Sequence, residues 1–252
     1  MALKIGIADY GMNVWEGGFF DYRQRLVDIK AIGYEGLERL RPVTEADAIN
    51  TAADVKRLGM DFATCLGPNV ETSLRWTAAL GKEYVWIEVQ ARNFDDFCRQ
   101  VNVQVKAGER YGVKTALHNH LGSLVETQEQ LDEFMKRCPD AGLLLDTGHL
   151  AVAGGDALLS ADKYYDRLVA VHLKNWVSTD VNAKEWYMRG YFTGLDYIPE
   201  GEHPVYVPNA EVIALLKARG FDKWIMVEHD THLQEPLVDL KASRDWMRAQ
   251  GI

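Results

Sequence analysis

Residues 107–120 read AGERYGVKTALHNH, and this segment passes from a helix-like pattern through a glycine into an apolar run that ends in two histidines. A glycine directly after a helix tolerates the left-handed conformation that caps a helix C-terminus. The continuous apolar run that follows is typical of a strand buried on both faces, as in a parallel sheet. The segment therefore predicts a helix, a cap at Gly112 and a strand at 114–118.

The same order of helix, glycine and strand recurs along the chain, with glycines at Gly33, Gly59, Gly81, Gly142 and Gly220. The expected strands are LKIGIA (3–8), YEGLE (34–38), DFATC (61–65), YVWIEV (84–89), KTALH (114–118), GLLLD (142–146), LVAVHL (168–173) and WIMVE (224–228). Strands that alternate with helices indicate βα units, and eight such units in 252 residues fit a (β/α)8 TIM barrel. We expect residues 1–252 to form a single TIM-barrel domain. An open doubly wound sheet is the alternative, but no glycine-rich phosphate-binding pattern follows the first strand.

One connection is much longer than the others. Residues 175–206 separate the seventh strand from the helix NAEVIALLKARG, and they are rich in aromatic side chains. These are Trp176, Trp186, Tyr187, Tyr191, Phe192 and Tyr197. A long irregular loop in a compact domain is usually functional or disordered. We expect an extended, packed loop after the seventh strand, either as a lid whose rings face a sugar or as a loop packed on its own aromatics.

Charge and cysteine content exclude several classes of protein. The formal net charge is −9 and the pI is near 5.3, and no run of Lys and Arg is present, which argues against nucleic-acid binding. The three cysteines, Cys65, Cys98 and Cys138, form neither a CxxC motif nor an even set, so we expect reduced thiols. The start MALKIGIADYGMN lacks a signal-peptide pattern, and no apolar run is long enough for a membrane span. We therefore expect a cytoplasmic protein.

Ionisable side chains gather at the expected C-terminal ends of the strands, which is where barrels of this kind carry their active sites. They are Glu38, Glu88, His118, His120, Asp146, His149, His172, Lys174, Glu228 and His229. Burying so many ionisable groups together is costly unless they pair with each other or bind a metal. Imidazole and carboxylate groups are ligands for Mn, Co, Fe, Mg or Zn. We expect a divalent metal site, with a purely structural polar cluster as the alternative.

Strand geometry predicts how these side chains point. Residues two apart in a strand share a face. His118 and His120 are therefore expected to point into the barrel mouth together, and His172 and Lys174 to share a face.

From residue 110 to residue 250 the chain resembles the inosose dehydratases, which are similar in turn to the other xylose isomerase-like TIM barrels. The resemblance is carried by HNHLGSLVET (118–127), LLLDTGHLAVAGGD (143–156), VHLKN (171–175), GYFTGLDYIPEGEHPVY (190–206), WIMVEHD (224–230) and EPLVDLKASRDWMRAQ (235–250). The resemblance implies a single metal, for which Mn is preferred and Co, Mg, Fe and Zn are alternatives. The ligands that it implies are His118, Asp146, His172 and Glu228. It also implies that His149 contacts substrate hydroxyls and that Glu202 lies in the turn that closes the site.

The chain departs from the family pattern at three positions. His118 stands where the sugar epimerases of the superfamily carry a glutamate, and a metal-bound imidazole does not readily act as a general base. Proton transfer between two glutamates is therefore disfavoured, and a one-base reaction such as β-elimination is favoured. Asn175 and Val177 replace an aspartate and an arginine, which points to a different substrate.

These features predict an enzyme that removes the proton α to the carbonyl of a keto-sugar, keto-glycoside or keto-cyclitol, as a divalent-metal-dependent lyase or dehydratase. His149, His120 and Lys174 are the candidate acids or bases, and Glu228 is both a ligand and a candidate catalytic group. Alternatively, His149 only binds substrate, and Lys174 forms an ion pair with Glu228 or Asp146.

Three other functions stay open. They are a sugar isomerase or epimerase on the same scaffold, a phosphodiester hydrolase like endonuclease IV, and a sugar-binding or partner subunit without activity. The hydrolase is disfavoured because the first three strands carry no histidine and the net charge is negative. We expect a small-molecule sugar or cyclitol as the ligand, and no nucleic acid or membrane partner. Either a homo-oligomer or a separate partner subunit is compatible with the sequence.

Overall fold

The computed structural model describes residues 3–9, 12, 21–178, 190–195, 203–205, 207–229 and 235–252. Of the residues singled out above, Trp186, Tyr187, Tyr197 and Glu202 lie outside this part of the chain, as does the side chain of Tyr191. Within the described ranges, no helix combines the length and the apolar character needed to cross a membrane.

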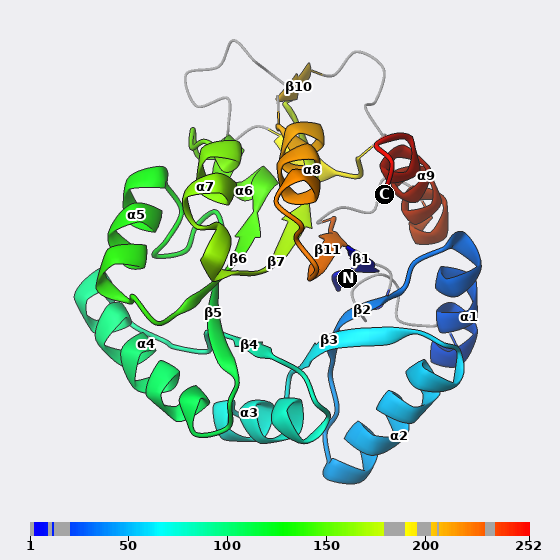
Figure 1. Cartoon of the computed structure of the whole chain (residues 1–252), viewed down its shortest axis with the longest axis horizontal. Coiled ribbons are helices and arrows are strands. Elements are labelled where there is room, and N and C mark those ends of the chain that lie inside the picture. The colour runs from blue at the N-terminus through cyan, green and yellow to red at the C-terminus, as the bar shows by residue number, and fades with distance from the viewer. Residues whose placement is uncertain are drawn as a thin grey trace.

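Eight parallel strands form a nearly closed barrel with helices on its outside (Figure 1). The strands are β1 (Lys4–Ile7), β2 (Gly36–Leu40), β3 (Asp61–Cys65), β4 (Tyr84–Trp86), β5 (Lys114–His118), β6 (Gly142–Asp146), β7 (Leu168–Leu173) and β11 (Trp224–Val227). Their order in the sheet is β3-β2-β1-β11-β7-β6-β5-β4. The predicted (β/α)8 barrel is thus confirmed, and each of the eight expected segments overlaps a strand of the barrel.

The helices that cover the barrel follow the strands in sequence. They are α1 (Tyr22–Ile32), α2 (Glu45–Arg57), α3 (Val70–Ala79), α4 (Phe94–Glu109), α5 (Gln128–Arg137), α6 (Thr147–Val152), α7 (Ala157–Lys163), α8 (Asn209–Ala218) and α9 (Pro236–Ala249). Gly112 after α4 has φ 68°, as its predicted cap role requires. Gly142 is different because it is the first residue of β6 and its φ is not positive. A Cβ at Gly142 would lie 2.8 Å from Cγ1 of Val169, so its lack of a side chain serves close strand packing.

Four strands end at positions other than the expected ones, β1 and β11 one residue early and β2 and β4 by two residues or more. β2 continues to Leu40, so Glu38 lies inside the strand and its buried side chain points into the barrel. β4 ends at Trp86, and Glu88 lies beyond it. The reason is Gln104 of α4, whose side-chain amide donates to the Trp86 carbonyl at 2.9 Å and accepts from the Glu88 backbone N–H at 3.0 Å. These two hydrogen bonds take the place of the backbone bonds that a longer β4 would make with a neighbouring strand.

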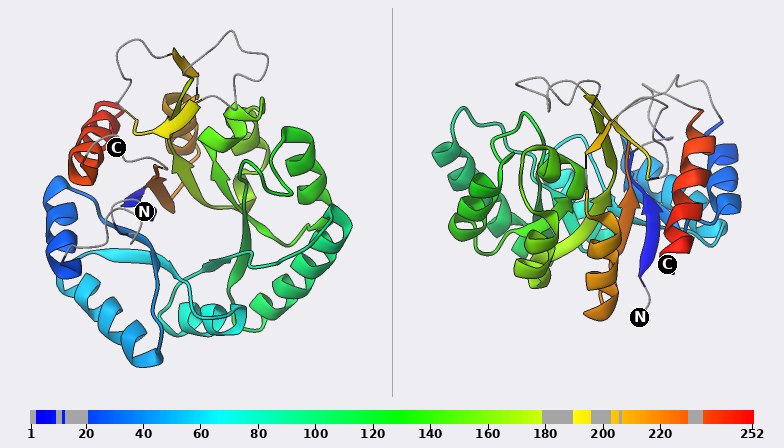
Figure 2. Two further views of the ribbon diagram at one scale, coloured as in Figure 1. Left: turned by 180° about the vertical axis from the view of Figure 1, so that it is seen from behind. Right: turned by 90° about the horizontal axis from the view of Figure 1, so that it is seen from above.

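The long connection after β7 contains a small antiparallel sheet instead of a purely irregular loop (Figure 2). It consists of β8 (Asn175–Ser178), β9 (Gly190–Thr193) and β10 (His203–Val205), in the order β10-β8-β9. Trp176 and Phe192 face each other across β8 and β9, with ring centroids 4.6 Å apart, and both are buried. The expectation of a packed aromatic connection is therefore confirmed for these two rings.

Candidate metal centre and active site

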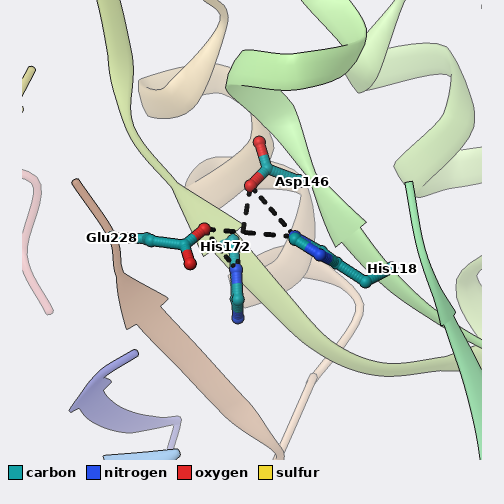
Figure 3. Close-up of side chains that lie close together, drawn as sticks. All are labelled: His118, Asp146, His172 and Glu228. Carbon is teal, nitrogen blue, oxygen red and sulfur yellow. Dashed lines mark hydrogen bonds and ion pairs between the residues drawn. The ribbon is translucent and has the colours of Figure 1, made fainter. Parts of the chain in front are cut away.

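Four side chains from four neighbouring strands converge at the C-terminal end of the barrel (Figure 3). They are His118 at the end of β5, Asp146 at the end of β6, His172 in β7 and Glu228 directly after β11. One nitrogen or oxygen atom from each lies within 4.8 Å of the others. The structure thus brings together the four residues that the family resemblance implies as metal ligands.

The distances between these atoms fit the coordination shell of one small cation. Nε2 of His118 lies 3.3 Å from Oδ2 of Asp146 and 4.0 Å from Oε2 of Glu228. Nδ1 of His172 lies 2.9 Å from the same Glu228 oxygen and 3.7 Å from the same Asp146 oxygen. Ligand bonds of about 2.0–2.2 Å place neighbouring ligand atoms roughly 3–3.6 Å apart. The observed separations bracket this range, so the donor set fits a divalent ion.

Glu38 lies behind His172, within ion-pair distance of its ring. Oε2 of Glu38 is 3.1 Å from Nε2 of His172, and Oε1 accepts hydrogen bonds from Trp86 and Tyr84. Burial by itself would lower the pKa of His172, but the carboxylates of Glu38 and Glu228 raise it well above its usual value. A carboxylate on the far nitrogen of a histidine is the usual support for a metal ligand, since it sets both tautomer and orientation.

Lys174 supplies positive charge to the cluster. Its Nζ lies 2.7 Å from Oε2 of Glu228 and 3.1 Å from Oδ2 of Asp146, and its side chain is fully buried. Burial raises the pKa of both carboxyls, but the ammonium of Lys174 and the neighbouring histidines together outweigh it and hold both pKa values well below their usual range. The ion pair that the sequence left open for Lys174 is therefore present. It does not exclude a catalytic role, because the same Nζ also lies 3.1 Å from Nε2 of His149.

The charges of the cluster favour a further cation. The buried carboxyls of Asp146 and Glu228 share the ammonium of Lys174, and the buried carboxyl of Glu38 lies against His172. Burial lowers the pKa of His118, although Asp146 opposes this, so its imidazole is neutral and able to act as a ligand. Buried carboxylates in excess of their cationic partners are stabilised by a metal ion.

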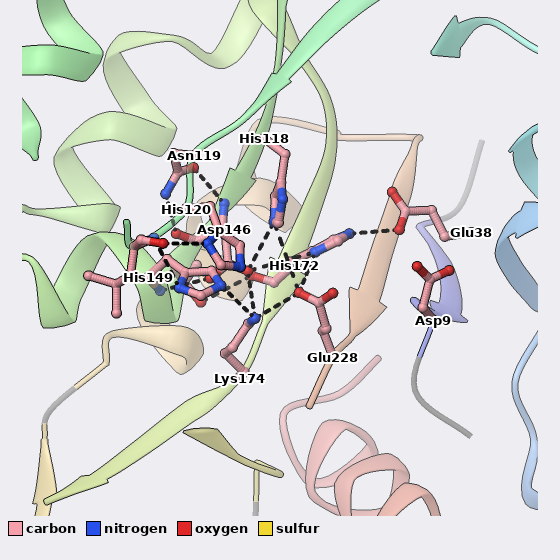
Figure 4. Close-up of polar contacts among 12 residues, drawn as sticks. Asp9, Glu38, His118, Asn119, His120, Asp146, His149, His172, Lys174 and Glu228 are labelled. Carbon is pink, nitrogen blue, oxygen red and sulfur yellow. Dashed lines mark hydrogen bonds and ion pairs between the residues drawn. The ribbon is translucent and has the colours of Figure 1, made fainter. Parts of the chain in front are cut away.

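His149 and His120 lie beside this cluster (Figure 4). The backbone N–H of His149 donates to Oδ1 of Asp146 at 2.8 Å, because Asp146 is the N-cap of α6. The His149 ring is buried, and burial lowers its pKa to about 2. The ring of His120 is exposed and its centroid lies 3.8 Å from that of His149. The two imidazoles therefore connect the buried lysine with solvent.

Two residues that the sequence did not single out support the site. Asn119 donates its amide to the Asp146 carbonyl at 3.0 Å and accepts the Asp146 backbone N–H at 2.9 Å, which locks the end of β6. The indole of Trp86 lies 4.4 Å from the His118 ring and 3.7 Å from the guanidinium of Arg39. The sequence could have revealed both residues only by their positions. Asn119 stands between two candidate histidines, and Trp86 precedes Glu88 by two residues in the same expected strand.

Other residues at the strand ends do not join the cluster. Nδ1 of His229 lies 3.5 Å from Oδ2 of Asp239 in α9. The Asn175 amide donates to the carbonyl of Leu195 at 2.8 Å, and its oxygen accepts from the Asn209 amide at 3.0 Å, so it fixes the connection after β7. Glu88 is half-buried beyond β4 and is held by its backbone bond to Gln104.

Comparison with known proteins agrees with this architecture. A family model described as a xylose isomerase-like TIM barrel matches residues 68–250. The chain belongs to the xylose isomerase-like TIM barrel family. In this chain the four converging side chains lie at the carboxyl end of the barrel, where TIM-barrel enzymes carry their active sites.

Several relatives of this sequence are named inosose dehydratases. An inosose dehydratase of Lactiplantibacillus plantarum is 32% identical over 143 residues, which is 54% of this chain and 47% of that protein. The chain spans about half the length of the curated relatives it matches. The resemblance to inosose dehydratases expected from the motifs is thus confirmed.

Solved structures share the fold at low identity. A probable 3-DHS dehydratase from Bacillus anthracis superposes with a TM-score of 0.70 at 15% identity, covering 98% of this chain and 99% of that one. A 3-keto-D-glucoside 4-epimerase from E. coli gives a TM-score of 0.68 at 15% identity, covering 98% and 100%. At this identity the comparison establishes the barrel only.

Proposed function

We propose that the protein is a divalent-metal-dependent lyase or dehydratase that removes the proton α to the carbonyl of a keto-sugar, keto-glycoside or keto-cyclitol. The observation that carries the proposal is the convergence of His118, Asp146, His172 and Glu228 within 4.8 Å at the barrel mouth. The dehydratase names of the relatives support the same class of reaction.

In this proposal His118, Asp146, His172 and Glu228 hold the ion, with Mn as the preferred metal and Co, Mg, Fe or Zn as alternatives. When bound, a divalent ion acts as a Lewis acid that polarises a carbonyl oxygen and stabilises the negative charge that develops on it. Glu38 supports His172 through an ion-pair contact of 3.1 Å, and Asn119 supports Asp146 through hydrogen bonds to its backbone.

The chain's own acids and bases lie on one side of the cluster. Lys174, His149 and His120 form a continuous series from the buried carboxylates to solvent, with 3.1 Å from Lys174 to His149 and 3.8 Å between the two ring centroids. One residue of this series takes the α-proton as the base. The same residue or another of the three gives a proton to the departing oxygen. General acid–base assistance of this kind contributes about 10²–10⁴ in rate.

Elimination is proposed ahead of epimerisation because strand β5 presents an imidazole. An epimerase that works through two carboxylates needs one on each face of the substrate, whereas His118 occupies the β5 position here. Isomerisation or epimerisation begins with the same proton abstraction and is the second candidate.

Reaction in heavy water distinguishes these outcomes. The metal-loaded protein is incubated with oxidised sugars, glycosides and inososes, and the products are examined by NMR and mass spectrometry. A new double bond or a released leaving group supports the lyase. Deuterium in an otherwise unchanged skeleton supports the isomerase or epimerase instead. Metal content is measured on the same samples, and less than about a tenth of an equivalent after reconstitution with Mn or Co contradicts the metal-dependent proposal.

A further inference from the structure

Two cavities lie at the barrel mouth, one toward β1 and β2 and one toward β4 and β5. The first, of about 300 Å³, is lined by charged and polar groups that include Asp9, Arg39, Arg41, Asp47 and Thr51. Arg39 and Arg41 both donate to Asp9. Such a lining suits hydroxyl groups, because paired carboxylates and guanidinium groups offer both acceptors and donors.

The second cavity has a volume of about 540 Å³ and lies between the segment after β4 and the segment after β5. Most of its lining is apolar, namely Trp86, Ile87, Val89, Ala91, Phe97, Leu117 and Leu124. The cavity is of the size that small-molecule pockets usually have, and such pockets are lined mainly by apolar and aromatic side chains with a few polar groups.

This apolar cavity adjoins the four proposed metal ligands. His118 and His120 belong to its lining, so one wall is formed by a proposed metal ligand and by a proposed proton carrier. Trp86 is the third shared element, since its ring lines the cavity and lies 4.4 Å from the His118 ring. A group bound in the cavity would therefore lie directly beside the reacting carbon atoms of the substrate.

A free sugar or cyclitol has only the C–H groups of its ring to place against Ile87, Val89 and Leu124. It would leave apolar walls in contact with water and some of its hydroxyls without partners, and both are unfavourable. We propose that the substrate is a keto-glycoside with an aromatic or similarly apolar aglycone, and that the aglycone occupies this cavity. The inference rests on the proposed lyase function and specifies its substrate class.

The chemistry is balanced without any further reactant. The bond between hydrogen and the α-carbon breaks, the proton goes to the base, and a carbon–carbon double bond forms. The bond from the β-carbon to the aglycone oxygen breaks, and that oxygen gains a proton from the acid. The products are an unsaturated keto-sugar and the free alcohol or phenol.

Binding of unreactive probes tests the cavity separately from turnover. Phenyl β-D-glucoside and methyl β-D-glucoside carry the same sugar, and their affinities are compared by calorimetry on the Mn-reconstituted protein. Burial of the phenyl ring should make the phenyl compound bind roughly 10- to 150-fold more tightly than the methyl compound. Equal affinities would overturn the proposal whether or not the lyase reaction is found.

Two variants show whether the preference originates in this cavity. Val89→Thr keeps the shape of the side chain but adds a hydroxyl, and Ala91→Phe fills the space. Each should weaken phenyl glucoside binding by about fivefold or more and leave methyl glucoside binding unchanged. Val103→Thr is the matched control, because Val103 lies on α4 and is 68% exposed.

Three further outcomes would also overturn the proposal. An unchanged phenyl preference in both cavity variants would place the aromatic ring elsewhere. A change of oligomeric state on Val89→Thr, measured by light scattering, would make the cavity a contact between subunits. Turnover of keto-glycosides with the same kcat/KM for phenyl and methyl aglycones would leave the lyase function in place and remove only the aglycone site.

Discussion

Nε2 of His172 lies 3.1 Å from Oε2 of Glu38, and both side chains are completely buried. The contact connects β7 with β2 through the interior of the barrel. With Nε2 committed to Glu38, the other ring nitrogen faces Glu228 and Asp146. The orientation of one proposed ligand is therefore set by a residue that does not itself reach the cluster.

Replacing Glu38 by glutamine should weaken metal binding without removing a ligand. Loss of such a supporting carboxylate typically costs about 10- to 100-fold in metal affinity. The measurement is competition with a chromogenic chelator for Mn or Co. Glu88→Gln is the control because Glu88 is half-buried beyond β4 and should leave affinity within about twofold. Similar losses in both variants would show that Glu38 has no specific effect on His172.

Asp146→Asn should abolish stabilisation by metal while keeping the helix cap. Asparagine still accepts the His149 backbone N–H that Asp146 accepts at 2.8 Å. At about 100 times its Kd, a metal should stabilise the native protein by about 2.7 kcal/mol, or roughly 5–10 °C in Tm. Differential scanning calorimetry with EDTA and with Mn should show this shift in the native protein and less than about 1 °C in the variant. An equal shift in both would contradict coordination by Asp146.

Lys174→Met should affect the metal-free and metal-loaded proteins in opposite ways. The ammonium lies within 3.1 Å of oxygens of Asp146 and Glu228, which are the oxygens proposed to bind the ion. Without it, two buried carboxylates lose their partner, at a cost of about 3–5 kcal/mol in the free energy of unfolding.

Metal should restore most of that loss and should bind the Lys174→Met variant at least as tightly as the native protein, because no ammonium competes for the oxygens. Urea unfolding with EDTA and with Mn measures both quantities. Equal destabilisation under the two conditions would show that lysine and metal do not share these oxygens.

Asp61 provides a pH test far from the site. Burial raises the pKa of Asp61, but hydrogen bonds from Lys56, Lys82 and the Phe62 backbone lower it below its usual value. A carboxyl with a lowered pKa contributes stability above its unfolded pKa and loses it as pH falls toward the folded value. Urea unfolding at pH 7 and pH 3 should therefore show a smaller pH dependence for Asp61→Asn than for the native protein. The exposed Asp166→Asn should behave like the native protein.

The barrel could be predicted because each βα unit repeats one local pattern. Gly112 follows a helix and precedes an apolar run, and the structure places a left-handed residue and a buried strand there. Strand ends were less predictable because tertiary bonds decide them. Gln104 lies on a separate helix, yet its amide ends β4 at Trp86. The sheet within 175–205 was missed since its three strands are short and pair with one another.

The four proposed ligands could be predicted from residue type and strand position together with family resemblance. The contact between Glu38 and His172 could not, because it joins residues that are distant in sequence and crosses the barrel interior. His229 shows that a position at the end of a strand does not by itself place a side chain in the cluster. It follows Glu228 directly, but neighbours on a strand face opposite sides, and its ring faces Asp239 of α9.

The nearly closed barrel has a seam, because within the described ranges no backbone pairing joins β3 to β4. Glu38 spans this seam from β2 by accepting the Tyr84 hydroxyl at 3.2 Å and the Trp86 indole N–H at 2.9 Å, both from β4. The same carboxyl group holds His172. Glu38 thus contacts both β4, at the open side of the barrel, and one of the proposed metal ligands. Amide hydrogen exchange along β4 would accordingly report on events at the ligands, although none of the four belongs to that strand.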